Sequence, residues 1–209
     1  MTTPLTSVLA GTRILPVLTV PSPTTAIPLA AALAEGGARC AEVTFRTDAA
    51  EQVVKAMAAH GGLTVGAGTV LTAEQAERAV AAGARFVVSP GFDEEVVAKC
   101  RELEVPVVPG VATATELMRA LRAGLDTVKL FPAEPLGGPD ALRALAAPFP
   151  QARFVPTGGI GIDRLADYFA EPSVLAVGGS WLAPVALLEC GDYAEILRLT
   201  AQAVERSRP

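Results

Sequence analysis

Short runs of β-branched and aromatic residues alternate along the chain with longer stretches rich in alanine and leucine that have helical periodicity. At three places a helical stretch ends at glycine and an apolar run follows at once: 35–45 (EGGARCAEVTF), 81–90 (AAGARFVVSP) and 122–132 (RAGLDTVKLFP). Glycine just after a helix supplies the left-handed turn with which many helices end. The pattern therefore predicts strands that each follow closely on a helix.

Helix starts are also visible in the sequence. Asp48, Thr72 and Thr113 are each followed three residues later by glutamate or glutamine, which is typical of the first turn of a helix. A last helix is predicted at 192–206, and a short one before the first strand. Between the helices, eight strands are predicted, at 14–20, 40–46, 63–69, 85–90, 105–110, 127–132, 153–157 and 174–178.

This alternation predicts a parallel sheet, because each helical crossover returns the chain to the same edge. Eight strand–helix units in 209 residues indicate the α/β class. The expected architecture is a single-domain (β/α)8 TIM barrel over residues 1–209 with a short N-terminal helix. A doubly wound open sheet is the alternative, and the number of strands favours closure. In a barrel, the active site lies at the C-terminal ends of the strands.

Composition excludes several classes of protein. Net charge is −5 and no basic patch stands out, which argues against a nucleic acid or an anionic membrane as partner. The most apolar stretch, 174–188, is broken by glycine and proline and is a poor membrane span. The N-terminus lacks a signal-peptide pattern. Cys40, Cys100 and Cys190 are far apart, so buried free thiols in a reducing, cytoplasmic compartment are expected. The single histidine, His60, precedes two glycines and is interpreted as the end of a helix.

Lys129 is the most informative residue. Of the three lysines in the chain, it alone is flanked by Val128, Leu130 and Phe131 in a predicted buried strand. Lysine is almost never fully buried unless it is paired or used chemically. Burial disfavours the charged form of an amine, and the neutral amine is a nucleophile. The alternative is a snorkelling or ion-paired lysine at the end of a strand.

The second predicted strand has an unusual inward face. Side chains alternate along a strand, so Val43 and Phe45 are expected to face the helices. Glu42, Thr44 and Arg46 then point into the barrel. Three inward polar residues are unfavourable unless they bond to one another or to a ligand.

In the sixth predicted strand, Lys129 and Phe131 face inward in the same way. A carboxylate, a guanidinium and an amine therefore converge on one pocket. This set suits imine formation with a ketone, with Glu42 as the general acid and base and Arg46 holding a carboxylate. The alternative is an internal ion pair that only holds the barrel together.

Two glycine pairs follow the last two predicted strands, in 156–161 (PTGGIG) and 177–181 (VGGSW). The loops after those strands are the usual phosphate site of such barrels, because glycine lets backbone N–H groups approach an anion. The alternative is a role in turn geometry alone. A phosphate there and a carboxylate at Arg46 would frame a ligand across the mouth of the barrel.

Seven segments between Ala41 and Leu182 resemble one known family: AEVTFRT, VGAGTVL, VSPGF, VPVVPGVATATEL, VKLFPAE, FVPTGGI and VGGSWL. The chain is similar to the class I 2-keto-3-deoxy-6-phosphogluconate (KDPG) and 4-hydroxy-2-oxoglutarate (KHG) aldolases. The resemblance implies a Schiff-base lyase that cleaves 2-dehydro-3-deoxy-6-phosphogluconate to pyruvate and D-glyceraldehyde 3-phosphate. It also implies cleavage of 4-hydroxy-2-oxoglutarate to pyruvate and glyoxylate.

The same resemblance implies a role for each matching residue. Lys129 forms the Schiff base and Glu42 shuttles protons. The substrate-binding residues implied are Arg46 and Thr69 for the pyruvyl carboxylate, Pro90 and Phe131 for the pyruvate pocket, Thr157 for the aldehyde-side hydroxyls, and Gly158, Gly159, Gly178, Gly179 and Ser180 for the phosphate. The family resemblance implies no cofactor, no metal and a homotrimer.

Three alternatives remain at this stage. The 2-dehydro-3-deoxy-6-phosphogalactonate aldolases have the same machinery and the opposite stereochemistry at one carbon, and Thr157 favours the gluconate form by resemblance only. A metal-dependent aldolase needs converging carboxylates or histidines, and the predicted strand ends offer Glu42 alone. A non-catalytic phosphosugar-binding barrel is the alternative from a different class.

Overall fold

The computed structural model describes residues 5–208, and all strand pairings in this part of the chain are parallel. Each predicted strand is present, most of them one to four residues shorter than expected. The strands are β1 (Ile14–Leu18), β2 (Cys40–Thr44), β3 (Thr64–Gly68), β4 (Val87–Val88), β5 (Val107–Val108), β6 (Gly110–Val111), β7 (Thr127–Leu130), β8 (Arg153–Pro156) and β9 (Val177–Gly179).

The strands close into a barrel. One sheet has the order β5-β4-β3-β2-β1-β9 and a second has the order β6-β7-β8. β5 and β6 are one segment interrupted at Pro109, whose carbonyl accepts a hydrogen bond from the Lys129 N–H at 2.9 Å. On the other side, β8 meets the segment leading into β9 through single bridges, Phe154 to Val174 and Thr157 to Gly178. The barrel prediction is therefore confirmed, and the open-sheet alternative is wrong.

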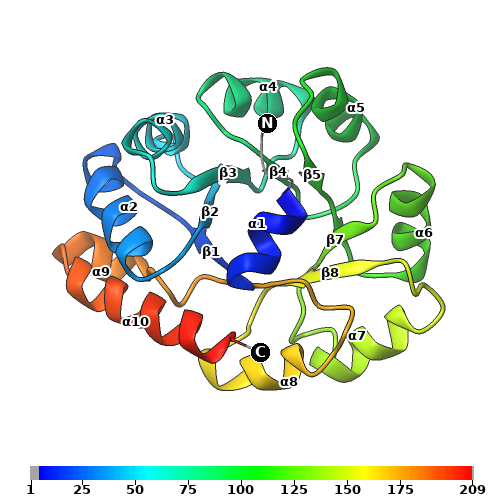
Figure 1. The fold of residues 1–209 in the computed structure, drawn as a ribbon. Helices are drawn as coiled ribbons and strands as arrows, with labels where there is room; N and C mark the ends of the chain where they lie inside the picture. The colour runs from blue at the N-terminus through cyan, green and yellow to red at the C-terminus, as the bar shows by residue number, and fades with distance from the viewer. Residues whose placement is uncertain (1–4, 209) are drawn as a thin grey trace.

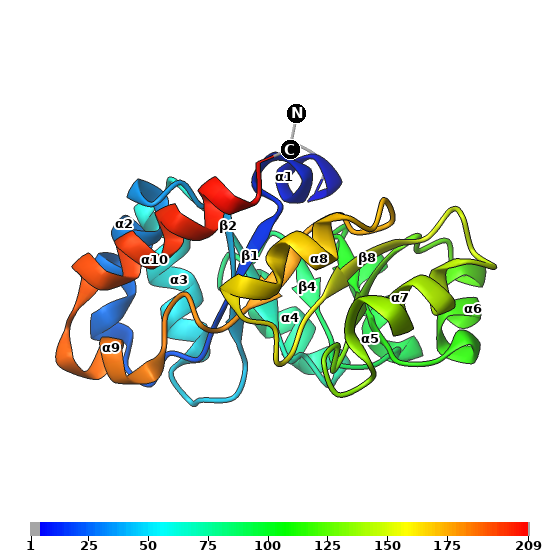
Figure 2. The same cartoon turned by 90° about the horizontal axis from the view of Figure 1, so that it is seen from below.

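Helices surround the barrel, and α1 lies across its N-terminal end (Figures 1 and 2). The predicted short N-terminal helix is thus confirmed. The helices are α1 (Leu5–Thr12), α2 (Ala26–Glu35), α3 (Ala50–His60), α4 (Ala73–Ala81), α5 (Glu94–Glu102), α6 (Ala114–Arg122), α7 (Gly138–Ala146), α8 (Leu165–Phe169), α9 (Val185–Cys190) and α10 (Tyr193–Arg206), with single 3-10 turns η1 (Pro23–Thr25) and η2 (Ile162–Arg164).

Two of the three predicted helix caps are present. The Thr72 hydroxyl accepts from the N–H of Gln75, and Thr113 forms a reciprocal capping box at the start of α6. The cap predicted at Asp48 is wrong, because α3 starts only at Ala50 and Ala49 occupies its N-cap position without a side-chain bond. A backbone turn precedes this helix and moves its start beyond the predicted residue.

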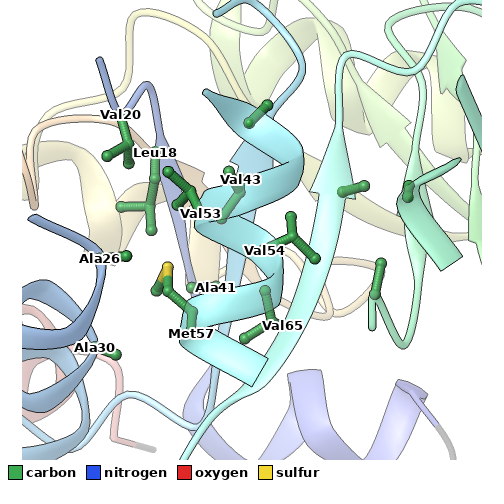
Figure 3. Packing of buried hydrophobic residues seen from close by; sticks show 14 of the residues in the cluster. Leu18, Val20, Ala26, Ala30, Ala41, Val43, Val53, Val54, Met57 and Val65 are labelled. Carbon is green, nitrogen blue, oxygen red and sulfur yellow. The ribbon is translucent and has the colours of Figure 1, made fainter. Parts of the chain in front are cut away.

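The outward faces of the strands pack on the helices as the alternation predicts. Figure 3 shows Ala41 and Val43 of β2 against Val53 and Met57 of α3. Phe45 packs on the same cluster while partly buried. The second strand therefore turns its apolar side chains outward, and its polar side chains must lie inside the barrel.

The interior of the barrel is filled by a separate cluster that includes Leu15, Cys40, Phe86 and Val155, and Leu9 of α1 closes it from below. Burial raises the pKa of the Cys40 thiol to about 12. Cys40 and Cys100 are buried free thiols, as expected. The same prediction is wrong for Cys190, which is exposed because it ends the short helix α9.

Within residues 5–208, no helix is both long enough and apolar enough to span a bilayer.

Candidate active site

A cleft of about 230 Å³ opens at the C-terminal ends of the strands. It is lined by residues at the ends of β1, β2, β7 and β9 and by residues that follow β1, β2, β3, β7, β8 and β9. Ten of the predicted site residues lie in its wall: Arg46, Thr69, Lys129, Phe131, Thr157, Gly158, Gly159, Gly178, Gly179 and Ser180. The structure therefore brings together, in one concave site, residues that are spread over most of the sequence.

Lys129 and Glu42 form a buried pair at the base of the cleft. Glu42 is fully buried and Lys129 is 5% exposed. The Lys129 Nζ donates to Glu42 Oε1 at 3.2 Å and lies 5.3 Å from the centre of the Phe131 ring. Among the described residues, Glu42 Oε2 is buried without a hydrogen-bond partner. An amine that a ligand can reach is thus held against a carboxylate with one oxygen free to handle a proton.

Two glycines on β3 make room for side chains inside the barrel, and Gly68 does so for the Glu42 carboxyl group. β2 and β3 pair in register, with Glu42 opposite Gly66 and Thr44 opposite Gly68. A β-carbon on Gly68 would overlap the Glu42 carboxyl, and one on Gly66 would overlap the Phe86 ring. The VGAGT segment therefore shapes the barrel interior so that a carboxylate fits beside Lys129.

Arg46 and Thr69 lie on one side of the cleft. Arg46 is exposed in the turn after β2 and has no ion pair or hydrogen bond with any residue that the structure describes. Thr69 has φ of 55°, a left-handed conformation that is uncommon for a β-branched residue. An unpaired guanidinium beside this residue suits a ligand carboxylate.

The glycine loop after β8 lies at another part of the wall. Gly158 and Gly159 have φ of 102° and 80°, which favour glycine. The carbonyls of Thr157 and Gly158 accept from the backbone of Ala133 and Glu134 at 2.8 and 3.0 Å. Within residues 5–208, the N–H groups of Gly158, Gly159 and Ile160 donate to no protein acceptor. These two loop carbonyls are thus occupied, and the three N–H groups are available for an anion.

Comparison with known proteins agrees with this geometry. The sequence profile described as "KDPG and KHG aldolase" matches residues 5–199. The chain belongs to the KDPG and KHG aldolase family. A 2-dehydro-3-deoxy-phosphogluconate aldolase of Treponema pallidum is 50% identical over 92% of each chain. A KHG/KDPG aldolase of Escherichia coli K12 is 44% identical over 97% of this chain and 95% of its own.

One solved structure of this aldolase family bears directly on the site. It is the KDPG aldolase of Legionella pneumophila with pyruvate captured at low pH as a covalent carbinolamine intermediate. It is 38% identical to this chain, with a TM-score of 0.91 over 95% of this chain and 97% of its own.

Two predicted site residues do not line the cleft. Glu42 lies beneath it and reaches it through Lys129. Pro90 is half-buried two residues after β4, where its carbonyl packs against Gly110. No three histidine, cysteine, aspartate or glutamate side chains gather into a possible metal site in the part of the aldolase that the structure describes.

The cleft also contains residues to which the sequence pattern assigns no site role: Val17, Thr19, Thr44 and Ile160. Thr44 is predicted to face inward, whereas no prediction places Val17 and Thr19, at the end of β1, in the site. The signal that could have found them is the alternation along 14–20, which puts both on the inner face at the C-terminal end of a strand.

Proposed function

We propose that this protein is a class I aldolase that cleaves 2-dehydro-3-deoxy-6-phosphogluconate to pyruvate and D-glyceraldehyde 3-phosphate, with Lys129 as the Schiff-base residue. The observation that carries the proposal is the buried Lys129–Glu42 pair at the base of a cleft. That cleft offers an unpaired guanidinium at Arg46 and available N–H groups in the glycine loop. The ends of the ligand thus match the two anion-binding parts of the wall.

The reaction begins at Lys129. Its neutral amine adds to the C2 ketone to give a carbinolamine, and loss of water gives an iminium ion. Glu42 removes the proton of the C4 hydroxyl, and the electrons of the C3–C4 bond move to the iminium nitrogen. The aldehyde leaves and an enamine remains. Protonation of C3 by Glu42 and addition of water then release pyruvate and the free amine.

The remaining residues bind the substrate. Arg46 and Thr69 hold the carboxylate, and Phe131 lies beside the pyruvyl group. Thr157 contacts the aldehyde-side hydroxyls, and Pro90 supports the pyruvate pocket from the end of β4. The phosphate lies against Gly158, Gly159, Gly178, Gly179 and Ser180. The carbinolamine in the Legionella relative supports imine chemistry, and the name of the Escherichia coli relative supports 4-hydroxy-2-oxoglutarate as a second substrate.

We also propose that residues 1–209 form one domain that works in the cytoplasm as a homotrimer. Cys40 and Cys100 are buried free thiols, which agrees with a reducing compartment. Ile27 and Leu71 are 56% and 55% exposed and offer apolar surface for subunit contacts.

Trapping of the imine tests the mechanism. Incubation with pyruvate and borohydride should attach a reduced pyruvyl group to Lys129, located by peptide mass spectrometry. Lys129→Ala should remove both the adduct and turnover. Lys55→Ala, at an exposed lysine of α3, is the matched control and should retain both. Normal turnover by Lys129→Ala, or an unmodified wild-type protein, would show that the mechanism is wrong.

Replacement of the partner carboxylate tests the proton shuttle. Glu42→Gln keeps the shape of the side chain but cannot accept the C4 proton. We expect kcat to fall by about 10²–10⁴-fold, measured with the gluconate substrate in the presence of EDTA. Wild-type activity should be unaffected by EDTA. Loss of activity in EDTA would favour the metal-dependent class, and an unchanged kcat for Glu42→Gln would remove Glu42 from the mechanism.

A further inference from the structure

Thr19 contributes a hydroxyl group to the cleft that the mechanism above does not use. It follows β1, is half-buried and lies in the wall of the cleft. Its oxygen is 3.0 Å from the Oγ1 of Thr44, a buried residue at the end of β2. Thr19 is therefore a polar residue in the wall of the cleft, whereas Val17, two residues earlier and also in the wall, is apolar.

The direction of this hydrogen bond can be worked out from the available hydrogens. The Thr44 hydroxyl lies 2.9 Å from the carbonyl of Leu18, and a carbonyl can only accept. The single hydrogen of Thr44 is thus used on Leu18. The hydrogen bond between the two threonines therefore forms with the Thr19 hydroxyl as donor and the Thr44 Oγ1 as acceptor. Thr19 then has no hydrogen left, and its oxygen offers only lone pairs to a ligand.

An oxygen with only lone pairs selects its ligand chemically. It repels the oxygens of a carboxylate or a phosphate and binds a group that carries a hydrogen, such as a ligand hydroxyl. Thr19 is therefore unsuited to either charged end of the proposed substrate.

The strand order puts Thr19 between those charged ends. β1 lies between β2, which leads to Arg46, and β9, which carries Gly178 and Gly179. A ligand with its carboxylate at Arg46 and its phosphate at the glycines passes the end of β1 with its middle carbons. In the proposed substrate these carbons carry the C4 hydroxyl, which gives up its proton, and the C5 hydroxyl, which takes no part in bond cleavage.

We propose that Thr19 Oγ1 accepts a hydrogen bond from the C5 hydroxyl of the substrate and so selects a hydroxylated aldehyde half. This inference rests on the proposed function. It makes Thr19 a specificity-determining residue of the aldehyde side, held in its accepting state by Thr44 and the Leu18 carbonyl.

The experiment runs the reaction in the direction of aldol addition, with pyruvate and two aldehydes. D-Glyceraldehyde 3-phosphate supplies the C5 hydroxyl, and 3-phosphopropanal lacks it. Thr19→Val should lower kcat/KM for D-glyceraldehyde 3-phosphate by about 2- to 12-fold, the range for one hydrogen bond. It should leave kcat/KM for 3-phosphopropanal unchanged. Thr19→Ser should restore the preference for the hydroxylated aldehyde.

Thr47→Val is the matched control. Thr47 donates to the carbonyl of Val20 at 2.8 Å, next to the same strand end but outside the wall of the cleft. It should change kcat/KM for the two aldehydes by the same factor. If Thr19→Val does the same, Thr19 only supports Thr44 and the inference is wrong. If Thr19→Val does not fold, Thr19→Ala provides the same comparison.

Exchange of the pyruvate C3 protons with D2O separates this inference from the proposed function, because exchange needs Lys129 but no aldehyde. Thr19→Val should exchange at the wild-type rate. A wild-type protein that neither exchanges nor condenses would overturn the proposed function itself. Wild-type exchange with equal losses for both aldehydes would overturn only the role of Thr19.

Discussion

At the scale of single residues, one missing β-carbon decides whether the buried Lys129–Glu42 pair, the proposed catalytic pair, can form. Glu42 is fully buried, and its carboxyl occupies the space that a side chain at Gly68 would take. Burial of a carboxylate is unfavourable unless it is paired, and Lys129 provides that pair at 3.2 Å. The geometry of the pair is thus set by a neighbour that makes no chemical contribution.

Gly68→Ala should therefore impair catalysis without removing any functional group. The new methyl group forces the Glu42 carboxyl away from Lys129, and kcat should fall by about 10²-fold or more, toward the effect of losing the acid and base. Steady-state kinetics with the gluconate substrate measures this. Gly91→Ala is the control, because a β-carbon there meets nothing within 4 Å. Wild-type kcat in Gly68→Ala would show that Glu42 has room to adapt.

The site residues that the sequence predicts are those whose chemistry conflicts with their surroundings. Lys129 stands between apolar neighbours, and Glu42 faces inward on a strand with an apolar outer face, so the residue pattern alone is enough to single out both. Thr19 causes no such conflict, because threonine after a strand is ordinary. Its role depends on which hydroxyl donates to which, and only the distances to Thr44 and Leu18 show this.

At the scale of elements, the sequence predicts a helix start correctly where no backbone turn comes between the capping residue and the helix. Thr113 and Glu116 form both bonds of a capping box, and the Glu116 carboxylate also accepts from the N–H of Ala112 at 2.8 Å. Asp48 has the same spacing to Glu51, but the turn after β2 shifts the helix start. The spacing is the same in both places, but before α3 the N–H of Ala50 donates to the carbonyl of Thr47 in a backbone turn.

Thr113→Ala should destabilise the protein by about 0.5–2 kcal/mol, because it removes the side-chain acceptor at the start of α6. The free energy of unfolding from urea titration is the measurement. Thr115→Ala is the control within the same helix, where Thr115 is exposed and alanine has the higher helix propensity. It should be neutral or slightly stabilising. Equal destabilisation by the two substitutions would mean that the cap contributes nothing specific.

At the scale of the whole molecule, closure of the barrel was favoured by the strand count, but its weak junctions were not visible in the sequence. Within residues 5–208, β8 joins the β9 side through two isolated bridges, Phe154 to Val174 and Thr157 to Gly178. Pro109 interrupts the fifth strand, where its carbonyl still bonds to β7. These junctions form between segments that are far apart in the sequence, and their positions are set by the pairing of all the other strands. A local sequence pattern therefore does not predict them.

The closed barrel should make thiol reactivity a reporter of global unfolding. Cys40 lies in the interior cluster that Leu9 of α1 closes, and Cys100 is buried on α5. Burial raises the pKa of Cys40 to about 12 and that of Cys100 to about 11, so almost no thiolate forms at pH 8. Cys190 is exposed on α9. We therefore expect Ellman's reagent to modify Cys190 rapidly in native protein. Cys40 and Cys100 should react only as fast as the whole barrel opens, and all three thiols should react at once in guanidinium chloride.

The raised pKa of Cys40 also predicts how stability depends on pH. Because unfolded thiols lose their protons near pH 9 and folded Cys40 does not, the free energy of unfolding should fall as pH rises from about 9 to about 12. Cys40→Ala should weaken that dependence on pH. In the labelling experiment, rapid modification of Cys40 in native protein would show instead that α1 moves away from the barrel without global unfolding.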